Sequence, residues 1–365
     1  MSRINDNKRK RVLHVVEAFG GGVYFFLKDL LNHSCMEGFD FDILYGNRES
    51  IEVEQMQRDF PRAKLIPWRS AQREIRPGKD FRAFYEASLC IKQLKPDIIH
   101  CHSSKAGALG RVAALFSGLK NRVIYTPHGL SFLKLDDPIW KRNLYRYTEW
   151  LCSRLGGEVV GCSSSEVQAL RQSRISARLI QNGVSITGTM AERIWADPIG
   201  VITVGRISIQ KNPQLFNDIA SSMPELSFTW VGDGEYRYLL TSKNIRVTGW
   251  QPREEIASCI SKSLIYLSTS SWEGLPLSVL EAMSQGMPLL LSRCVGHVDV
   301  VNEENGKLFN ERDEAIFYLK EMIGDPKKLQ AMGKASRELV EKDFSVDKMV
   351  RAYFKLYQSK VCDEI

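Results

Sequence analysis

The sequence predicts an α/β protein of two domains, each built on a doubly wound parallel sheet with helices on both faces. Short apolar runs that fit buried strands alternate along the chain with segments of helical spacing. Three glycines at residues 20–22 follow the first such strand and open a helix, which is how a doubly wound domain begins. A chain of 365 residues is also too long for one hydrophobic core and fits two domains.

The first domain is expected over residues 10–184. Its glycine loop lacks the Gly-x-Gly-x-x-Gly spacing of dinucleotide-binding domains, which argues against a dinucleotide there. Asp40 and Asp42 match a metal-binding Asp-x-Asp pattern. They stand at the start of a strand, where aspartate is common, so we interpret them as structural. Strands of this domain are predicted at residues 12–16, 39–45, 98–100, 123–126 and 158–162.

Polar residues follow two of these strands. His128 stands in the exit loop of a strand, just before Gly129, where a histidine is better placed for chemistry than in the core. Ser103, Ser104 and Lys105 stand where a strand ends and the next helix starts. They are suited to bind a polar ligand, although a serine at this position can equally serve only to cap the helix.

The second domain is expected over residues 199–344, after an aperiodic linker at residues 185–198. Its first strand is followed by Arg206 and Lys211, ahead of a helix that starts near Pro213. Two cations at this place would neutralise a diphosphate, or they belong to an ordinary exposed loop. Strands of this domain are predicted at residues 201–204, 226–231, 245–249, 264–267, 287–292 and 306–309.

The most informative stretch is residues 271–283, which follows a buried strand. It places Glu273 on a loop and Glu281 on the helix that begins near Pro276. Free amides at the start of that helix, near Leu275 and Leu277, suit a phosphate group. A carboxylate accepts hydrogen bonds from two adjacent hydroxyls at once and therefore suits a sugar. The alternative is a pair of solvated glutamates, because helix starts attract acidic residues.

Residues 272–283 read Trp-Glu-Gly-Leu-Pro-Leu-Ser-Val-Leu-Glu-Ala-Met, which resembles the paired-glutamate signature of retaining family-four glycosyltransferases. Further matching segments are Gly-Arg followed by Lys at residues 205–211, Gly-Asp-Gly at 232–234 and Asn-Gly-Val at 182–184. The resemblance covers nearly the whole chain. It implies the GT-B architecture, in which two Rossmann-like domains face each other across the active site. A terminal helix, here within residues 345–365, returns to the first domain.

The resemblance also implies roles for single residues. His128 would contact the transferred sugar, and Glu273, Lys211 and Arg206 would complete the catalytic set. No metal is implied. Ser103, Ser104 and Lys105 would touch the acceptor. The implied nucleotide-sugar site comprises Gly21, Gly22, Arg206, Lys211, Val247, Gly249, Glu273, Gly274, Leu275, Leu277 and Glu281.

Composition limits the location and the partners. The net charge is +7, and basic residues cluster at residues 8–11, 69–82 and 141–146. These clusters fit a solvated surface. Alternatively, they attract an anionic partner, either lipid headgroups or a substrate that carries a pyrophosphate. No nucleic-acid motif accompanies the charge. Residues 140–150 mix aromatic and basic side chains, as in a helix at a membrane interface or a packed helix with a basic face. Eight scattered cysteines indicate a reducing compartment, and neither a membrane-spanning run nor a signal-peptide pattern is seen.

Together these features predict a retaining glycosyltransferase of bacterial surface-polysaccharide synthesis. It would move a sugar from a nucleoside-diphosphate donor to an undecaprenyl-pyrophosphate-linked saccharide. The expected nucleotide of the donor is UDP, and a guanosine nucleotide is its main competitor. The expected location is cytoplasmic, peripheral on the cytoplasmic face of the inner membrane. Two alternatives stay open: a non-catalytic nucleotide-sugar-binding protein of the same fold, and a sugar-nucleotide epimerase.

Overall fold

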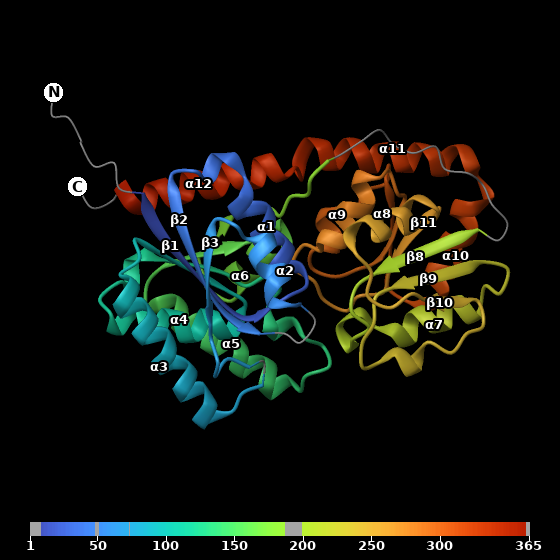
Figure 1. The fold of residues 1–365 in the computed structure, drawn as a ribbon. Helices are drawn as coiled ribbons and strands as arrows, with labels where there is room; N and C mark the ends of the chain where they lie inside the picture. Colours follow the sequence, from blue (N-terminus) through green and yellow to red (C-terminus); the bar gives the residue numbers. More distant parts are fainter. Residues whose placement is uncertain (1–8, 48–50, 73, 187–198, 363–365) are drawn as a thin grey trace.

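The computed structural model describes residues 9–47, 51–72, 74–186 and 199–362, and it folds into two lobes (Figure 1). The first lobe holds a sheet of seven parallel strands in the order β3-β2-β1-β4-β5-β6-β7. Its central strands β4 and β5 are buried along their whole length because both faces of the sheet are covered. The strands are β1 (Lys10–Phe19), β2 (Phe39–Asn47), β3 (Ala63–Pro67), β4 (Ile98–His102), β5 (Val123–Thr126), β6 (Glu158–Gly161) and β7 (Arg178–Leu179).

Successive side chains of β1 point to opposite faces of the sheet, and each face packs into a separate hydrophobic core. Val12 and Val16 point into a core shared with α1, whereas Leu13 and Val15 point into a core shared with α3 and α4. Asp42, on the neighbouring strand β2, lies 3.5 Å from Arg11 and thus forms an ion pair between adjacent strands. The helices of this lobe are α1 (Gly22–Asn32), α2 (Val53–Asp59), α3 (Pro77–Leu94), α4 (Ser104–Phe116), α5 (Ile139–Arg154) and α6 (Ser164–Gln172).

The second lobe holds six parallel strands in the order β10-β9-β8-β11-β12-β13. Its strands are β8 (Gly200–Val204), β9 (Ser227–Val231), β10 (Ile245–Val247), β11 (Ile265–Ser268), β12 (Leu289–Ser292) and β13 (Gly306–Phe309). Its helices are α7 (Pro213–Ser221), α8 (Arg253–Ser261), α9 (Leu277–Ser284), α10 (Arg312–Gly324) and α11 (Pro326–Asp343).

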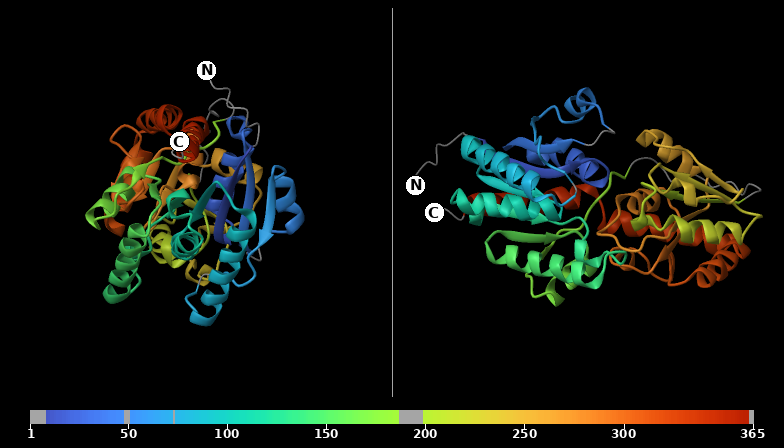
Figure 2. Two further views of the ribbon diagram at one scale, coloured as in Figure 1. Left: turned by 90° about the vertical axis from the view of Figure 1, so that its left-hand side faces the viewer. Right: turned by 90° about the horizontal axis from the view of Figure 1, so that it is seen from below.

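The last helix, α12 (Val346–Cys362), leaves the second lobe and packs on the first. Figures 1 and 2 show α11 and α12, in red, crossing the molecule from one lobe to the other. Met349, Val350, Tyr353, Leu356 and Tyr357 are buried in the same core as β1 and α1. Burial of a large apolar side chain stabilises a fold by about 1.5–3 kcal/mol, so this helix is a structural part of the first domain.

The predicted α/β fold, with two doubly wound sheets and a returning terminal helix, is therefore confirmed. Residues 187–198 of the predicted linker lie outside the described residues, as do residues 363–365 of the terminal segment. No helix in the described part of the chain is long and apolar enough to cross a bilayer.

Candidate active site

The candidate site is built on two loops of the second domain that leave neighbouring strands. Strands β8 and β11 are parallel and adjacent, so their exit loops meet at the same edge of the sheet. The first loop ends in the 3-10 turn η4 (Ile209–Lys211), and the second carries Glu273. The hydroxyl of Thr269 donates to the backbone carbonyl of Lys211 over 2.7 Å, which fixes the two loops against each other.

Lys211 and Glu273 form an ion pair at this edge. Nζ of Lys211 lies 2.8 Å from Oε1 of Glu273, and the Gln210 amide donates to the other carboxylate oxygen over 3.3 Å. Only 16% of the Lys211 side chain and 9% of that of Glu273 are exposed. Burial opposes both charges, but the lysine outweighs this and lowers the pKa of Glu273, while the glutamate raises the pKa of Lys211. Both groups are therefore charged at neutral pH.

The loop geometry also accounts for Gly205, which separates β8 from Arg206. Its φ is +146°, and a Cβ added there would lie 3.0 Å from Cε of Lys211. A side chain at this position would therefore displace the lysine. Arg206 is half-buried, with its guanidinium carbon 6.0 Å from the ring centre of Trp250.

Val247 and Gly249, two residues of the implied nucleotide-sugar site, lie near the loop that carries Arg206. Val247 ends β10, and Gly249, with a φ of +75°, forms an antiparallel bridge with Gly232. Trp250, which approaches Arg206, directly follows Gly249 in the chain. The structure thus places Val247 and Gly249 beside the loop that carries Arg206 and Lys211, the two cations predicted to neutralise a diphosphate.

Glu281, the second glutamate of the implied nucleotide-sugar site, lies in α9 and pairs with Arg253, a cation that the sequence does not indicate. Arg253 Nη2 lies 2.8 Å from Glu281 Oε1, and Nη1 lies 3.6 Å from a carboxylate oxygen of Asp29 in the first domain. The guanidinium also lies 5.3 Å from the ring centre of Phe25. Burial raises the pKa of Glu281, with Arg253 opposing it, so the two predicted glutamates differ in environment.

The first domain meets this site at His128 and Gly129. A Cβ added to Gly274 would lie 2.8 Å from the backbone nitrogen of Gly129 and 2.9 Å from the carbonyl carbon of His128. The two domains are therefore in backbone contact, and Glu273 directly precedes this contact. His128 itself has a φ of +54°, which is uncommon for a residue with a side chain. The Glu166 carboxylate accepts from the Gly129 amide over 2.8 Å and fixes this turn.

The predicted acceptor residues begin α4, next to the end of β5. The Ser103 amide donates to the Thr126 carbonyl over 3.0 Å, and the Ser104 hydroxyl accepts from Ser131. The Lys105 ammonium lies 2.5 Å from Asp80 and donates to backbone carbonyls of residues 72 and 74, so it is already occupied by protein groups.

Gly21 and Gly22 open α1. Gly21 has a φ of +58°, which glycine adopts readily, and Gly22 has open space around it. The following turns of α1 carry Phe25 and Asp29, the two residues that contact Arg253 of the second domain. The glycine loop therefore begins a helix that faces the other lobe. Leu275 and Leu277 also lie between the lobes: the Leu275 carbonyl accepts from Asn182 over 2.9 Å, and Leu277 packs against the first-domain core.

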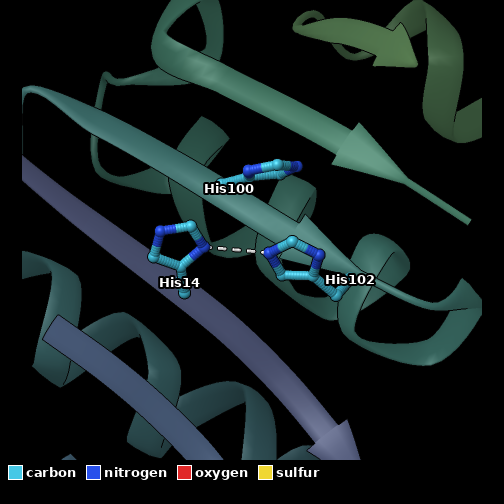
Figure 3. A group of neighbouring side chains, drawn as sticks. All are labelled: His14, His100 and His102. Atoms are coloured by element: carbon cyan, nitrogen blue, oxygen red, sulfur yellow. Dashed lines mark hydrogen bonds between the residues drawn. The ribbon is translucent and has the colours of Figure 1, made fainter. Parts of the chain in front are cut away.

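One group of side chains in the described residues could hold a metal ion. His14 on β1 and His100 and His102 on β4 are buried, with nitrogen atoms within 4.8 Å of one another (Figure 3). All but one of their ring nitrogens bond to protein groups; Nε2 of His14 is buried and has no hydrogen-bond partner among the described residues. His100 bonds to Tyr357 and Thr126, and His102 bonds to His14. The arrangement therefore fits a hydrogen-bonded cluster better than a vacant ligand set.

Comparison with known proteins identifies the family. Residues 20–187 match a model described as Glycosyltransferase Family 4, and residues 162–339 match one described as Glycosyl transferases group 1. The two matches follow one another along the chain and together take in both lobes. The chain belongs to the family-four glycosyltransferases. It is therefore a glycosyltransferase, and its two facing α/β domains have the GT-B architecture.

Relatives of this glycosyltransferase extend over most of its length. It is 29% identical over 357 residues to an Escherichia coli UDP-Gal:alpha-D-GlcNAc-diphosphoundecaprenol alpha-1,3-galactosyltransferase, covering 89% of this chain and 90% of the relative. Among solved structures, sucrose-phosphate synthase from Thermosynechococcus elongatus superposes with a TM-score of 0.80 at 18% identity, over 96% of this chain and 99% of that one. HepE of Anabaena in complex with UDP-glucose superposes at 0.76 and 15% identity, over 96% and 99%. At these identities the solved structures support the fold alone.

Several residues around the site of this glycosyltransferase carry no sequence signal. Gln210 lies beside Lys211 and bonds to Glu273. Arg253 reaches Glu281 from α8, an element that the sequence analysis does not predict. Ser165 and Asp299, which bond across the domain interface, are 134 residues apart. Contacts between separate elements of this kind are decided by the fold rather than by local spacing.

Proposed function

We propose that the protein is a retaining glycosyltransferase that moves a sugar from a nucleoside diphosphate, UDP in the first instance, to a hydroxyl of a saccharide carried on a lipid diphosphate. The observation that carries this proposal is the buried Lys211–Glu273 pair, which lies where the second domain meets the His128 turn of the first. The donor and the acceptor chemistry are supported by the name of the Escherichia coli relative, and a UDP donor also by the UDP-glucose complex of HepE. Such a reaction belongs to bacterial surface-polysaccharide synthesis.

The proposed mechanism follows the charges that develop as the bond between the anomeric carbon and the phosphate oxygen breaks. Arg206, Lys211 and the amides at the start of α9 stabilise the leaving diphosphate, so the mechanism uses no metal. Glu273 accepts hydrogen bonds from sugar hydroxyls, and His128 contacts the transferred sugar. The acceptor oxygen bonds to the anomeric carbon from the face that the phosphate leaves, and its proton passes to the leaving phosphate. Each stabilising contact contributes about 3–4 kcal/mol to lowering the barrier.

Purified protein incubated with a panel of nucleotide sugars and lipid-diphosphate saccharides tests the proposal, with nucleotide release and product mass as readouts. We expect Lys211→Ala and Glu273→Ala each to lower transfer by about 100-fold or more, because each removes a contact to the developing charge. Lys334→Ala and Glu338→Ala are matched controls, because this lysine–glutamate pair is exposed on α11.

Each other outcome has a meaning. Near-normal rates in both site variants would contradict the site assignment. Nucleotide binding without transfer or donor hydrolysis would indicate a binding protein, and conversion of the donor sugar without acceptor would indicate an epimerase.

We further propose that the first domain docks on the cytoplasmic face of the inner membrane, where a lipid-linked acceptor resides. Helix α5 exposes a stripe formed by Trp140, Leu144, Tyr147 and Leu151, whose spacing places them on one face. Arg146 and Arg154 are exposed on the same helix. Exposed aromatic side chains with adjacent arginines suit the headgroup region of anionic lipid. Phe81 and Tyr85 extend the exposed apolar surface on α3, and α4 packs against both helices.

Co-sedimentation with vesicles containing anionic phospholipid tests this docking. Trp140→Ser combined with Tyr147→Ser removes side chains that are 68% and 58% exposed, and we expect it to lower the bound fraction several-fold. Phe317→Ser is the matched control, because Phe317 is 64% exposed on the second domain. Equal binding by the double variant and the wild type would contradict docking through α5.

A further inference from the structure

A line of hydrogen-bonded histidines leads from the core of the first domain to His128. Nδ1 of His14 lies 2.9 Å from Nε2 of His102, the contact drawn in Figure 3, and Nδ1 of His102 lies 3.0 Å from Nε2 of His128. Successive rings in the line are nearly parallel, with interplanar angles of 21° and 19°. The side chains of His14 and His102 are completely buried. The line therefore ends at the residue that meets the second domain.

Strand pairing creates this line. In the register of β1 with β4, His14 pairs with His100 and Val16 with His102, so the side chains of His14 and His102 emerge on the same face of the sheet. The register of β4 with β5 places His102 opposite Thr126, two residues before His128. The left-handed backbone of His128 then turns its ring toward His102.

The chemistry of neutral imidazole constrains the three rings. A neutral ring has one N–H donor and one bare acceptor nitrogen, and His102 uses both nitrogens within the line. It must therefore donate to one neighbour and accept from the other. Because each contact joins Nδ1 of one ring to Nε2 of the next, all three rings carry their proton on the same type of nitrogen, either all on Nδ1 or all on Nε2.

Burial keeps the rings neutral, which this arrangement requires. It lowers the pKa of His14 to about 3 and that of His102 well below its ordinary range. The groups that face His128 from other elements are Phe26 on α1, His102 on β4 and the backbone beside Glu273, whose charge is paired with Lys211. Nε2 of His128 is occupied, so Nδ1 is the nitrogen left for a substrate.

We propose that His14 and His102 are positioning residues, which fix the ring of His128 in one orientation and one tautomer so that Nδ1 meets the transferred sugar in a defined protonation state. The contact between His128 and the transferred sugar rests on the proposed function. The coupling of the three tautomers does not rest on it, because it follows from the contacts within the protein alone.

Nitrogen NMR of the full chain, labelled with ¹⁵N-histidine, tests the coupling without any substrate. We expect the rings of His14, His102 and His128 each to show a single tautomer at pH 7, and the same one in all three. Mixed tautomers within the line would overturn the proposal. A stoichiometric metal ion bound by His14, His100 and His102 would overturn it too, because coordination would break the contact between His14 and His102.

Two substitutions separate the two contacts of His102. The amide of asparagine can take the place of Nδ1 and keep the bond to His128, whereas that of glutamine can take the place of Nε2 and keep only the bond to His14. We expect His102→Gln to give a mixture of tautomers at His128 and to lower kcat about 10- to 100-fold with little change in the donor KM, as misplacement of a reacting group does. His102→Asn is expected to retain one tautomer at His128 and most of kcat.

Tyr357→Phe is the matched control, because it removes a buried hydrogen bond to His100 in the same core but leaves the line intact. Its kcat is expected to match that of the wild type. Equal kcat for His102→Gln and the wild type would overturn the positioning role. If no transfer reaction is found at all, the proposed function fails while the NMR result still decides the coupling.

Discussion

At the scale of single residues, the backbone contact between the two domains at the His128 turn depends on a glycine. A Cβ on Gly274 would lie within 3 Å of the backbone of His128 and Gly129, and 2.9 Å from Sγ of Cys162. Backbone and a buried sulfur cannot move aside as the end of a flexible side chain can. Gly274 therefore allows Glu273 to reach the His128 turn, and this packing role adds to the place in the nucleotide-sugar site that the family resemblance implies.

Gly274→Ala is expected to keep the domains from reaching this contact. Overpacking by one methyl group costs about 1–3 kcal/mol, so we expect kcat/KM for transfer to fall by about 10-fold or more, with the thermal stability of each domain little changed. Steady-state kinetics and a melting curve measure the two effects. Gly324→Ala is the control, because a Cβ there has open space. Equal rates for both alanine variants would show that the contact is not required.

The residues of the site divide into those that the sequence predicts and those that it does not. Lys211 and Glu273 are found together as predicted, because each belongs to a loop that leaves a strongly apolar strand. Arg253 is not predicted from the sequence. Its contact with Glu281 joins residues 28 positions apart, and its contact with Asp29 joins the two domains. The pairing of His14 with His102 is not predicted either. The two residues are 88 positions apart in the sequence, and they meet only through the register of β1 with β4.

At the scale of elements, the sequence predicts the buried strands best. β8, β9, β11 and β12 are buried along most of their length, so they read as mainly apolar runs. The sequence analysis misses β3, an edge strand of mixed burial, and β7, which has only two residues, both exposed. It also misses α2, α8, α10 and α11, whose polar faces are extensive and whose apolar contacts depend on neighbours far away in the sequence.

Helix α12 offers a test of how the two lobes are joined. Tyr357 is fully buried, packs against Phe39 and hydrogen-bonds to His100, although it lies more than 250 residues beyond both. Tyr357→Ala would leave a cavity and an unpaired imidazole nitrogen, which costs about 3–5 kcal/mol. We expect hydrogen exchange to accelerate in β1, β4 and α1 of the first domain. Lys355→Ala, at an exposed position of the same helix, is the control. Faster exchange confined to the second lobe would contradict this account.

At the scale of the whole molecule, buried histidines make stability depend on pH. Burial lowers the pKa of five histidines, to about 3 for His14 and His128, to about 4 for His297, and well below the ordinary range for His100 and His102. The unfolded chain takes up protons at these residues near pH 6.5, whereas the folded protein does not. The unfolded state therefore binds more protons below pH 6.5, and by linkage the free energy of unfolding falls as the pH falls.

Each such histidine costs about 1.4 kcal/mol of stability per pH unit below 6.5. Burial also raises the pKa of Glu166 and Glu281, which acts in the opposite sense, but these two carboxyl groups are outnumbered by the histidines. Since a folded domain is stable by only about 5–15 kcal/mol, we expect a marked loss between pH 7 and pH 5.5. Urea unfolding at a series of pH values measures the slope, to which these histidines should contribute the uptake of up to five protons toward the acid end. His14→Phe, if folded, should reduce the slope by one proton, and a flat profile down to pH 5.5 would show that the histidines are not held neutral by the fold.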